Sequence, residues 1–249
     1  MAEDSGGGEE KKDETGEDDA FISIRIQRDM LHTKLGGSIP YGSLILVEGK
    51  DGAGKSLLVQ RLAYAFLRNG ATVTYISAEL STKDFLEQMD SLKYVVDDYI
   101  IDSRLLFIPM FPFIGGGKLR MDFLDRLLAA QKLFDQRIII LDTLSFLLVQ
   151  GNISQEKAFD AIKFFKKIVN KGKIVIFTVD PEQLNLGLLA LLRSVSDIYL
   201  SFGTKTLGGD VKKFMSVNRF KRAKIPVVAQ IAFRVEPGQG MIIDIGGLA

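Results

Sequence analysis

Short apolar runs alternate along the chain with longer segments in which apolar residues recur every three or four positions. The apolar runs are rich in β-branched and aromatic residues and predict strands at 44–47, 72–77, 105–109, 138–141, 174–179 and 197–202. Segments with helical spacing lie between them at 57–66, 82–93, 119–134, 155–170 and 182–192. This alternation predicts an α/β fold, in which a mostly parallel sheet is flanked by helices. The last apolar segments, 213–220, 227–235 and 241–245, are separated by short turns and predict an antiparallel hairpin at the sheet edge.

A glycine-rich loop separates the first of these strands from its helix. The residues Gly49-x-x-x-x-Gly54-Lys55-Ser56 match the phosphate-loop (Walker A) pattern. Glycines let several backbone N–H groups turn inward, and the helix that follows adds its own free N–H groups and the positive end of its dipole. Lys55 would reach the β- and γ-phosphates, and Ser56 would hold Mg²⁺. The residues predicted to bind the nucleotide are Gly49, Lys50, Asp51, Gly52, Ala53, Gly54, Lys55, Ser56 and Leu57.

Two carboxylates stand where strands end. Asp142 directly follows the apolar run 138–141, and ligands bind at the carboxyl ends of the strands in open α/β sheets. A carboxylate placed there, close to Ser56, would hold the water shell of Mg²⁺, as the Walker-B aspartate does. Glu79 follows the strand 72–77 and would polarise the attacking water beside the γ-phosphate. The alternative for Asp142 is a helix cap or a loop aspartate. The alternative for Glu79 is a carboxylate at the start of a helix, where it complements the dipole.

Further polar residues near strand ends have two readings each. Thr178 and Asp180 would sense the γ-phosphate or bond to the carboxylate that polarises water, or they are ordinary turn residues. Arg219, Lys221 and Arg222 form a basic cluster on the late strands. They would reach the phosphates of a neighbouring subunit, as an arginine finger does, or form a solvated basic face.

Composition narrows the classes of protein. The 249 residues include no cysteine and one histidine, His32, which we expect to be structural, so disulfides and Cys/His metal clusters are excluded. No apolar run is long enough to span a membrane and no signal peptide is evident, so we expect a cytoplasmic protein. Residues 1–20 hold nine acidic residues and two lysines, and we expect a disordered acidic tail. Residues 21–249 would form one ATP-binding domain with an excess of basic residues.

The sequence gives weaker evidence on the base of the nucleotide, on nucleic acid and on a partner surface. The segment 170–173 ends in Lys and lacks the aspartate of the Asn-Lys-x-Asp guanine motif, so adenine is the expected base. The segments 145–152 and 180–195 carry a single arginine between them, which argues against binding of nucleic acid. The loop 110–117 contains Phe111-Pro112-Phe113, which would be a partner surface, a lid or part of the core.

The chain from about residue 21 resembles the RecA/KaiC superfamily of ATPases. The approach Leu35-Gly36-Gly37-x-Ile39-Pro40-x-Gly42-Ser43, the single carboxylate Glu79 and the pair Asp142-Thr143 resemble the superfamily's motifs. The segment 76–83 and the single-domain length are similar to the FlaH-type accessory ATPases of the archaeal flagellum (archaellum). KaiC has a glutamate pair where this chain has Ala78-Glu79, which argues against clock-like autophosphorylation.

This resemblance implies a RecA-like (KaiC-type) phosphate-loop ATPase core that binds ATP and Mg²⁺ with weak or no hydrolysis. It also implies a peripheral place at the archaellum motor base, with contacts to the motor ATPase, the membrane platform protein and a scaffold ring. ATP would favour a homo-oligomeric ring, with a hexamer as one form, and would act as a switch of assembly. No nucleic acid and no direct membrane insertion are expected. The alternative is a RecA-like ATPase with full turnover that works in DNA handling or in KaiC-like signalling.

Overall fold

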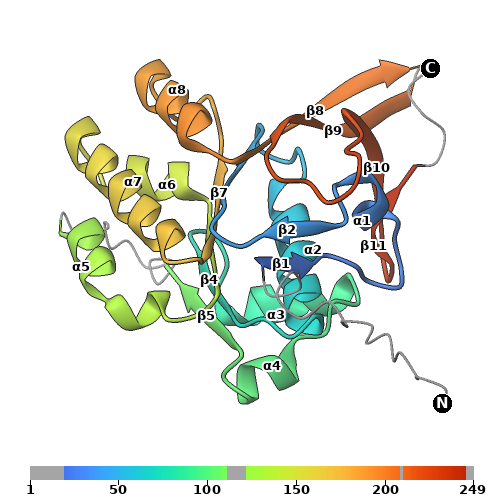
Figure 1. The fold of residues 1–249 in the computed structure, drawn as a ribbon, viewed down its shortest axis with the longest axis horizontal. Coiled ribbons are helices and arrows are strands. Elements are labelled where there is room, and N and C mark those ends of the chain that lie inside the picture. Colours follow the sequence, from blue (N-terminus) through green and yellow to red (C-terminus); the bar gives the residue numbers. More distant parts are fainter. Residues whose placement is uncertain (1–19, 111–121, 208–209, 245–249) are drawn as a thin grey trace, which may run out of the picture.

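A nine-stranded sheet forms the centre of the computed structural model, which describes residues 20–110, 122–207 and 210–244. The strands follow one another in the order β11-β10-β9-β8-β3-β7-β6-β4-β5, and Figure 1 labels all of them except β3 and β6. The parallel strands are β3 (Leu44–Glu48), β4 (Val73–Ser77), β5 (Leu105–Pro109), β6 (Ile138–Asp142), β7 (Ile174–Val179) and β8 (Ile198–Leu207). The antiparallel strands are β9 (Asp210–Phe220), β10 (Gln230–Glu236) and β11 (Gly240–Ile243). The predicted α/β class and the antiparallel carboxyl-terminal strands are confirmed.

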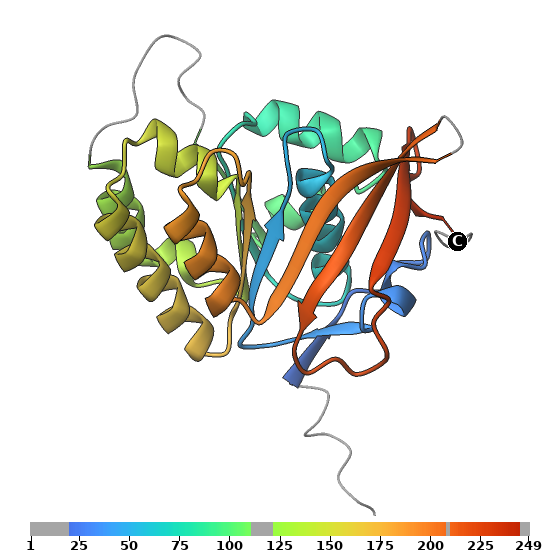
Figure 2. The same ribbon diagram turned by 90° about the horizontal axis from the view of Figure 1, so that it is seen from above.

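Helices cover both faces of the sheet, and each face has its own apolar core (Figure 2). The strand residues are completely buried in β3, β4, β6 and β7, as a parallel sheet with two covered faces requires. One face carries α1 (Leu31–Lys34), α2 (Lys55–Arg68), α3 (Thr82–Ser91), α4 (Asp97–Ile101) and the small sheet of β1 (Phe21–Ser23) and β2 (Ser38–Pro40). The other carries α5 (Phe123–Ala129), α6 (Leu144–Gln150), α7 (Gln155–Asn170) and α8 (Leu186–Val195).

Local capping explains where the main helices begin and end. The hydroxyl of Ser81 accepts a hydrogen bond from the N–H of Asp84 at 3.1 Å, so α3 begins where the sequence predicts. Helix α2 ends at Arg68. Two residues later Gly70, with a φ of +92°, lets the N–H of Ala71 donate to the carbonyl of Phe66 and close the last turn. These caps fix the end of α2, which follows the glycine loop, and the beginning of α3, which follows the end of β4 at Ser77.

Two predicted helices differ from the structure, and one helix was not predicted. The helix expected at 119–134 breaks at Ala130, whose ψ of 66° is not helical, and a short 3-10 turn (Gln131–Phe134) follows. The helix expected from 182 begins four residues later, because the side chain of Asn185 caps it. Residues 144–150, for which the sequence predicts no element, form α6. The segment Phe111-Pro112-Phe113 and the acidic residues 1–19 lie outside the described residues, so both predictions about them remain predictions.

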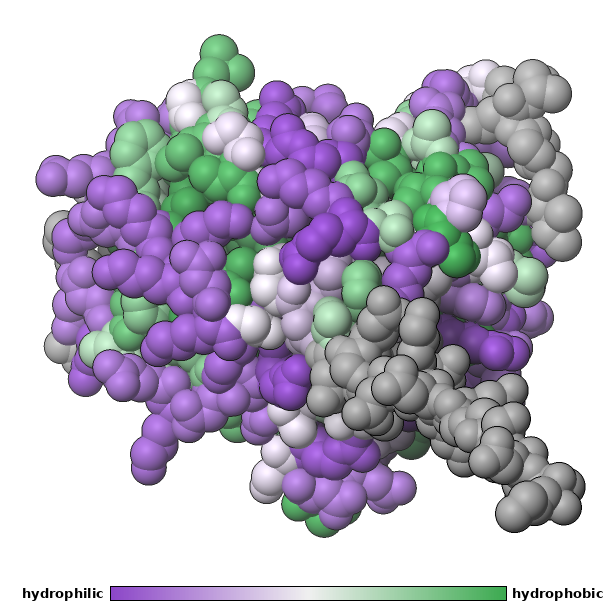
Figure 3. Space-filling view, viewed as in Figure 1, coloured by the Kyte–Doolittle hydropathy of each residue, from purple (hydrophilic) through white to green (hydrophobic). Residues whose placement is uncertain are grey.

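The face in Figure 3 is mostly hydrophilic, with hydrophobic side chains gathered over α8 at the upper left. Leu186, the first residue of α8, is 84% exposed. Among the described residues, no helix is both long and apolar enough to cross a membrane.

Candidate functional site

The glycine loop closes tightly over the carboxyl end of β3. Gly52 and Gly54 have φ angles of +68° and +113°, which residues with a side chain rarely adopt. A Cβ atom at Gly54 would also lie 2.9 Å from the ring of Phe233 on β10. The loop therefore depends on glycine for its turn and for the close approach of the antiparallel strands.

A cavity of about 330 Å³ opens beside this loop. It brings together the loop, the end of β4 and strand β9, which are far apart in the sequence. Of the residues predicted to bind the nucleotide, three do not line the cavity: Gly49, Lys50 and Ala53. Gly49 packs against Phe202, and a Cβ atom at Gly49 would lie 2.8 Å from the Cβ of Phe202. The predicted site residues that line the cavity are Asp51, Gly52, Gly54, Lys55, Ser56, Leu57 and Glu79.

Three lysines surround the loop, and each has a partner. Lys55 is buried and its Nζ donates to the carbonyl of Lys50 at 2.8 Å. Lys50 itself forms an exposed ion pair with Glu182 at 2.5 Å, and the hydrogen bond to this carboxylate raises the pKa of Lys50. Lys213 on β9 donates to the carbonyl of Gly52 at 2.7 Å and lines the same cavity. Lys55 and Lys213 thus hold the loop in shape and also line the space for a phosphate.

Asp142 is the centre of a buried cluster of hydroxyl groups. Its Oδ1 accepts hydrogen bonds from Ser56 at 3.1 Å and from Thr178 at 2.6 Å, and its Oδ2 accepts one from Tyr75 at 2.6 Å. Burial, together with the negative charge of Asp142, holds the pKa of Tyr75 well above its ordinary value. The phenol therefore keeps its proton and donates to Asp142, fixing the carboxylate next to the helix that follows the loop.

Ser56 and Asp142 are oxygen donors of the kind that Mg²⁺ prefers. Their side chains meet at the end of the loop, as the sequence predicts. No group of three or more His, Cys, Asp or Glu side chains suited to a metal occurs in the described ranges. A metal with few protein ligands fits this arrangement, because Mg²⁺ usually takes most of its ligands from water and phosphate oxygens. Ser56 would hold the ion directly, and Asp142 would hold its water.

Glu79 lies at the rim of the same cavity and is exposed. Its Oε1 accepts a hydrogen bond from the hydroxyl of Thr143 at 2.9 Å. A bond to Glu79 was one of the alternatives for Thr178 and Asp180, and neither forms it; the hydroxyl of Thr178 donates to Asp142. Asp180 is buried and accepts from the N–H of Glu182 at 2.9 Å, which is the ordinary turn role.

The basic cluster of the late strands lies at the other end of the sheet. Arg219 pairs with Tyr199, near the start of β8, whereas the loop follows the end of β3. Arg219 donates to the carbonyls of Arg193 and Ser196 at 2.6 and 2.9 Å. Lys221 and Arg222 also have partners within the chain. The structure therefore does not bring these residues to the chain's own phosphate loop, and a contact across a subunit boundary remains a prediction.

Several residues of the site gave no signal in the sequence. Glu48, at the end of β3, is bound by Arg193 of α8 at 2.5 Å and by the hydroxyl of Tyr199 at 2.8 Å. This cluster fixes the strand residue immediately before the loop. Tyr75 and Lys213 are equally inconspicuous, because only the strand order brings them to Asp142 and Gly52.

The comparisons with known proteins agree with this geometry. The model of the ATPase family KaiC matches residues 24–245. The chain is 36% identical over 226 residues to the archaeal flagellar ATP-binding protein FlaH of Methanocaldococcus jannaschii, covering 91% of this chain and 97% of that protein. It is 33% identical over 229 residues to the FlaH of Methanococcus voltae, covering 92% and 99%.

Solved structures give the same answer. The crystal structure of the flagellar accessory protein FlaH from M. jannaschii superposes with a TM-score of 0.85 and covers 91% of this chain and all of that one. A KaiC-like protein from Pyrococcus horikoshii, 14% identical, covers 88% of this chain and 98% of its own with a TM-score of 0.69, which supports the fold alone. The chain belongs to the KaiC family of ATPases and, within it, to the archaeal flagellar ATP-binding proteins of the FlaH type.

Proposed function

We propose that this chain binds Mg-ATP at the loop 49–57 and serves as an accessory subunit of the archaellum motor. The hydrogen bond between Ser56 and Asp142 carries the proposal, because it joins the loop hydroxyl to the strand-end carboxylate at one point. The names of the relatives as flagellar ATP-binding proteins support the same activity. The chain would work peripherally at the motor base, beside the motor ATPase, the membrane platform protein and a scaffold ring.

Hydrolysis by the isolated chain is expected to be weak or absent. Glu79 lines the cavity and is placed to polarise a water, but no arginine is among the residues that line it. Arginine fingers stabilise the charge that develops on the transferred phosphoryl group. Such a charge would come only from a neighbouring subunit, through its Arg219, Lys221 and Arg222. We therefore propose that ATP favours a ring of subunits, and a hexamer is one such form.

A set of two substitutions separates binding from hydrolysis. Asp142→Asn should weaken binding of ATP in the presence of Mg²⁺, because the amide places an N–H₂ group where hydroxyl donors and the metal's water meet. Glu79→Gln should leave the affinity nearly unchanged and abolish the slow hydrolysis. Isothermal titration and a phosphate-release assay measure the two effects. Equal hydrolysis by Glu79→Gln and the unchanged chain would remove Glu79 from the reaction.

Partner binding tests the accessory role itself. The chain should bind the archaellum motor ATPase more tightly with ATP than with ADP, and light scattering should show a larger mass with ATP. A variant with Arg219, Lys221 and Arg222 changed to Ala should lose the increase in mass. Rapid turnover with no effect of ATP on mass or partner binding would instead support a freely acting RecA-like ATPase.

A further inference from the structure

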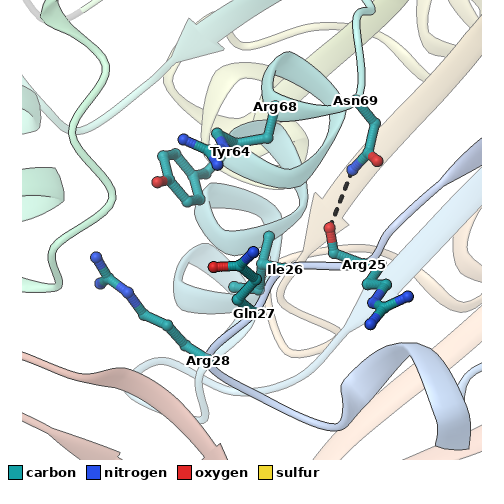
Figure 4. A pocket seen from close by; sticks show the side chains of 7 residues that line it. All are labelled: Arg25, Ile26, Gln27, Arg28, Tyr64, Arg68 and Asn69. Atoms are coloured by element: carbon teal, nitrogen blue, oxygen red, sulfur yellow. Dashed lines mark hydrogen bonds between the residues drawn. The ribbon is translucent and has the colours of Figure 1, made fainter.

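A second pocket lies far from the phosphate loop, at the opposite end of α2. It has a volume of about 410 Å³ and lies between the end of α2 and the segment 25–28, which follows β1 (Figure 4). Arg25, Arg28 and Arg68 line it together with Tyr64 and Asn69. In Figure 4, Arg28 and Arg68 extend on the side of the Tyr64 ring, and Arg25 turns to the other side of its segment.

These three guanidinium groups have no hydrogen bond or ion pair with any other described residue. This sets them apart from the rest of the described arginines, each of which contacts a carboxylate, a carbonyl or an aromatic ring. Those arginines are Arg61, Arg104, Arg126, Arg137, Arg193, Arg219, Arg222 and Arg234. The described arginines that lack a partner among the described residues therefore all line one pocket.

The carboxylate that follows Arg28 in the sequence, that of Asp29, is already paired. Asp29 is buried, and both of its oxygens accept hydrogen bonds from Arg61, at 2.7 and 3.0 Å. Its Oδ1 also accepts from the N–H of Leu31 at 3.0 Å. No acidic side chain is among the residues that line the pocket. Burial lowers the pKa of nearby His32, and the charge of Arg25 adds to this shift.

The pocket is itself a firm structure. Arg61 holds the carbonyl of Ile24 at 2.6 Å as well as Asp29, so the segment 24–29 is fixed to the middle of α2. The side chain of Asn69 donates to the carbonyl of Arg25 at 3.0 Å. Tyr64 stacks on Tyr94 of the neighbouring turn, with ring centroids 5.3 Å apart. Guanidinium groups on such a frame suit carboxylates and phosphates, which they bind with two parallel hydrogen bonds.

We propose that the acidic amino-terminal segment of the same chain, residues 3–19, occupies this pocket. The segment carries nine carboxylates and two lysines. It joins the described chain at Ala20, five residues before Arg25, so that even extended chain keeps its last residues within about 20 Å of the pocket. Covalent attachment gives its carboxylates an effective concentration of about millimolar, above that of most free anions. The family model matches residues 24–245, so this segment lies outside the match.

Occupation of the pocket would cover the basic surface without involving the phosphate loop. The negative dipole end of α2 lies at this pocket and disfavours an anion, so the arginines supply the attraction. The contact is therefore expected to be strongly dependent on salt. A partner that presents an acidic peptide would have to displace the segment before it could bind here.

The experiment uses the full chain and exploits its lack of cysteine. Spin labels at Thr15→Cys and Gln27→Cys report the distance from the segment to the pocket without removing a charge. The expected result is a narrow short-distance population that broadens and lengthens when Arg25, Arg28 and Arg68 are changed to Gln. The short-distance population should also be lost in about 1 M NaCl, where the screening length falls to roughly 3 Å.

A matched variant controls for the loss of charge alone. Lys132, Lys167 and Lys171 are exposed on the other face of the sheet, and their change to Gln should leave the short distance intact. An equal distance distribution in all three proteins would overturn the proposal.

A second measurement avoids a label inside the pocket. In a full chain whose nine acidic residues at 3–19 are changed to Asn or Gln, an added peptide of residues 3–19 should bind. Its binding should weaken at least tenfold in the triple Arg→Gln background. Pyrophosphate and vesicles of anionic lipid are the competing probes. If either of them binds in an arginine-dependent way while the peptide does not, the pocket is a site for small phosphates or lipid and the proposal is wrong.

Discussion

The two ends of helix α2 both carry cations, but they differ in how those cations are held. At its beginning, Lys50, Lys55 and Lys213 each have a defined partner in or beside the phosphate loop. At its end, Arg25, Arg28 and Arg68 surround a pocket without a carboxylate. The helix dipole favours an anion at the first end and disfavours one at the second.

The difference teaches that charge and geometry contribute separately to anion binding. The loop end combines fixed N–H groups, a helix dipole and buried side chains, so it can select one ligand of defined shape. The pocket end offers long exposed side chains, which attract many anions and select weakly among them. The predictions below test the two ends separately, beginning with the largest effect.

Asp29→Ala should be the most damaging single change and should act on the pocket end. It leaves Arg61 buried without its carboxylate, and breaking a buried ion pair costs about 3–5 kcal/mol. Urea denaturation measures the loss, and ATP titration should show that the phosphate loop still binds nucleotide in the folded protein. Asp90→Ala is the control, since its pair with Lys93 is exposed and worth about 1 kcal/mol or less. A loss as small as that of the control would contradict the role of Asp29.

Lys55→Ala should be the largest change at the loop end. Each charge-assisted hydrogen bond contributes about 1.5–3 kcal/mol, so the affinity for Mg-ATP should fall roughly 10- to 150-fold. Lys213→Ala should cost less, about fivefold, because its side chain is only partly buried. Lys212→Ala is the matched control, because Lys212 is the exposed neighbour on the same strand and has no place in the cavity. Titration calorimetry gives all three values, and an effect of Lys212 equal to that of Lys213 would contradict a specific role for Lys213.

The sequence predicted the parts of the fold that local pattern determines. The six parallel strands and helices α2, α3 and α7 lie close to the expected positions, because buried apolar runs, Ser81 and the glycines act within a few residues. Helix α6 was missed because its seven residues, Leu144–Gln150, are too few for a clear helical period. The break at Ala130 was missed because no glycine or proline marks it.

The candidate site was predictable only as far as its motifs extend. The loop, Asp142 and Glu79 lie in one region because the carboxyl ends of parallel strands share an edge. The order of the strands was not predicted, and it places β7 between β3 and β6 and β4 beside β6. That order decides that Thr178 and Tyr75 contact Asp142. Arg193 reaches Glu48 across 145 residues, and local sequence holds no information on such a contact.

Tyr75→Phe should give a smaller effect that distinguishes buried geometry from charge at the loop end. The change removes one donor to Asp142 without changing any charge, and a hydrogen bond to a buried carboxylate contributes about 1–2 kcal/mol. We expect a several-fold loss in the affinity for ATP at limiting Mg²⁺ and a similar loss of stability. The control is Tyr94→Phe, which removes a hydroxyl bonded to the N–H of Met241 and should leave the Mg²⁺ dependence unchanged. Equal Mg²⁺ dependence in Tyr75→Phe and the unchanged chain would show that Asp142 is oriented without the phenol.

The smallest effect concerns Tyr199, whose hydroxyl donates to Glu48 immediately before the loop. Burial, with the hydrogen bond to Glu48 next, raises the pKa of Tyr199 from 10.0 to about 12. The raised pKa means that the folded chain keeps this proton while the unfolded chain loses it. Its contribution to stability is therefore complete below pH 10 and is lost as the pH rises from 10 towards 12. Tyr199→Phe should flatten the fall in the free energy of unfolding across this window, measured by urea denaturation at several pH values. Tyr75 is present in both Tyr199→Phe and the unchanged chain, so its contribution cancels when their free energies of unfolding are subtracted. If the free energy of unfolding fell equally steeply with pH in both proteins, Glu48 would be held by Arg193 alone.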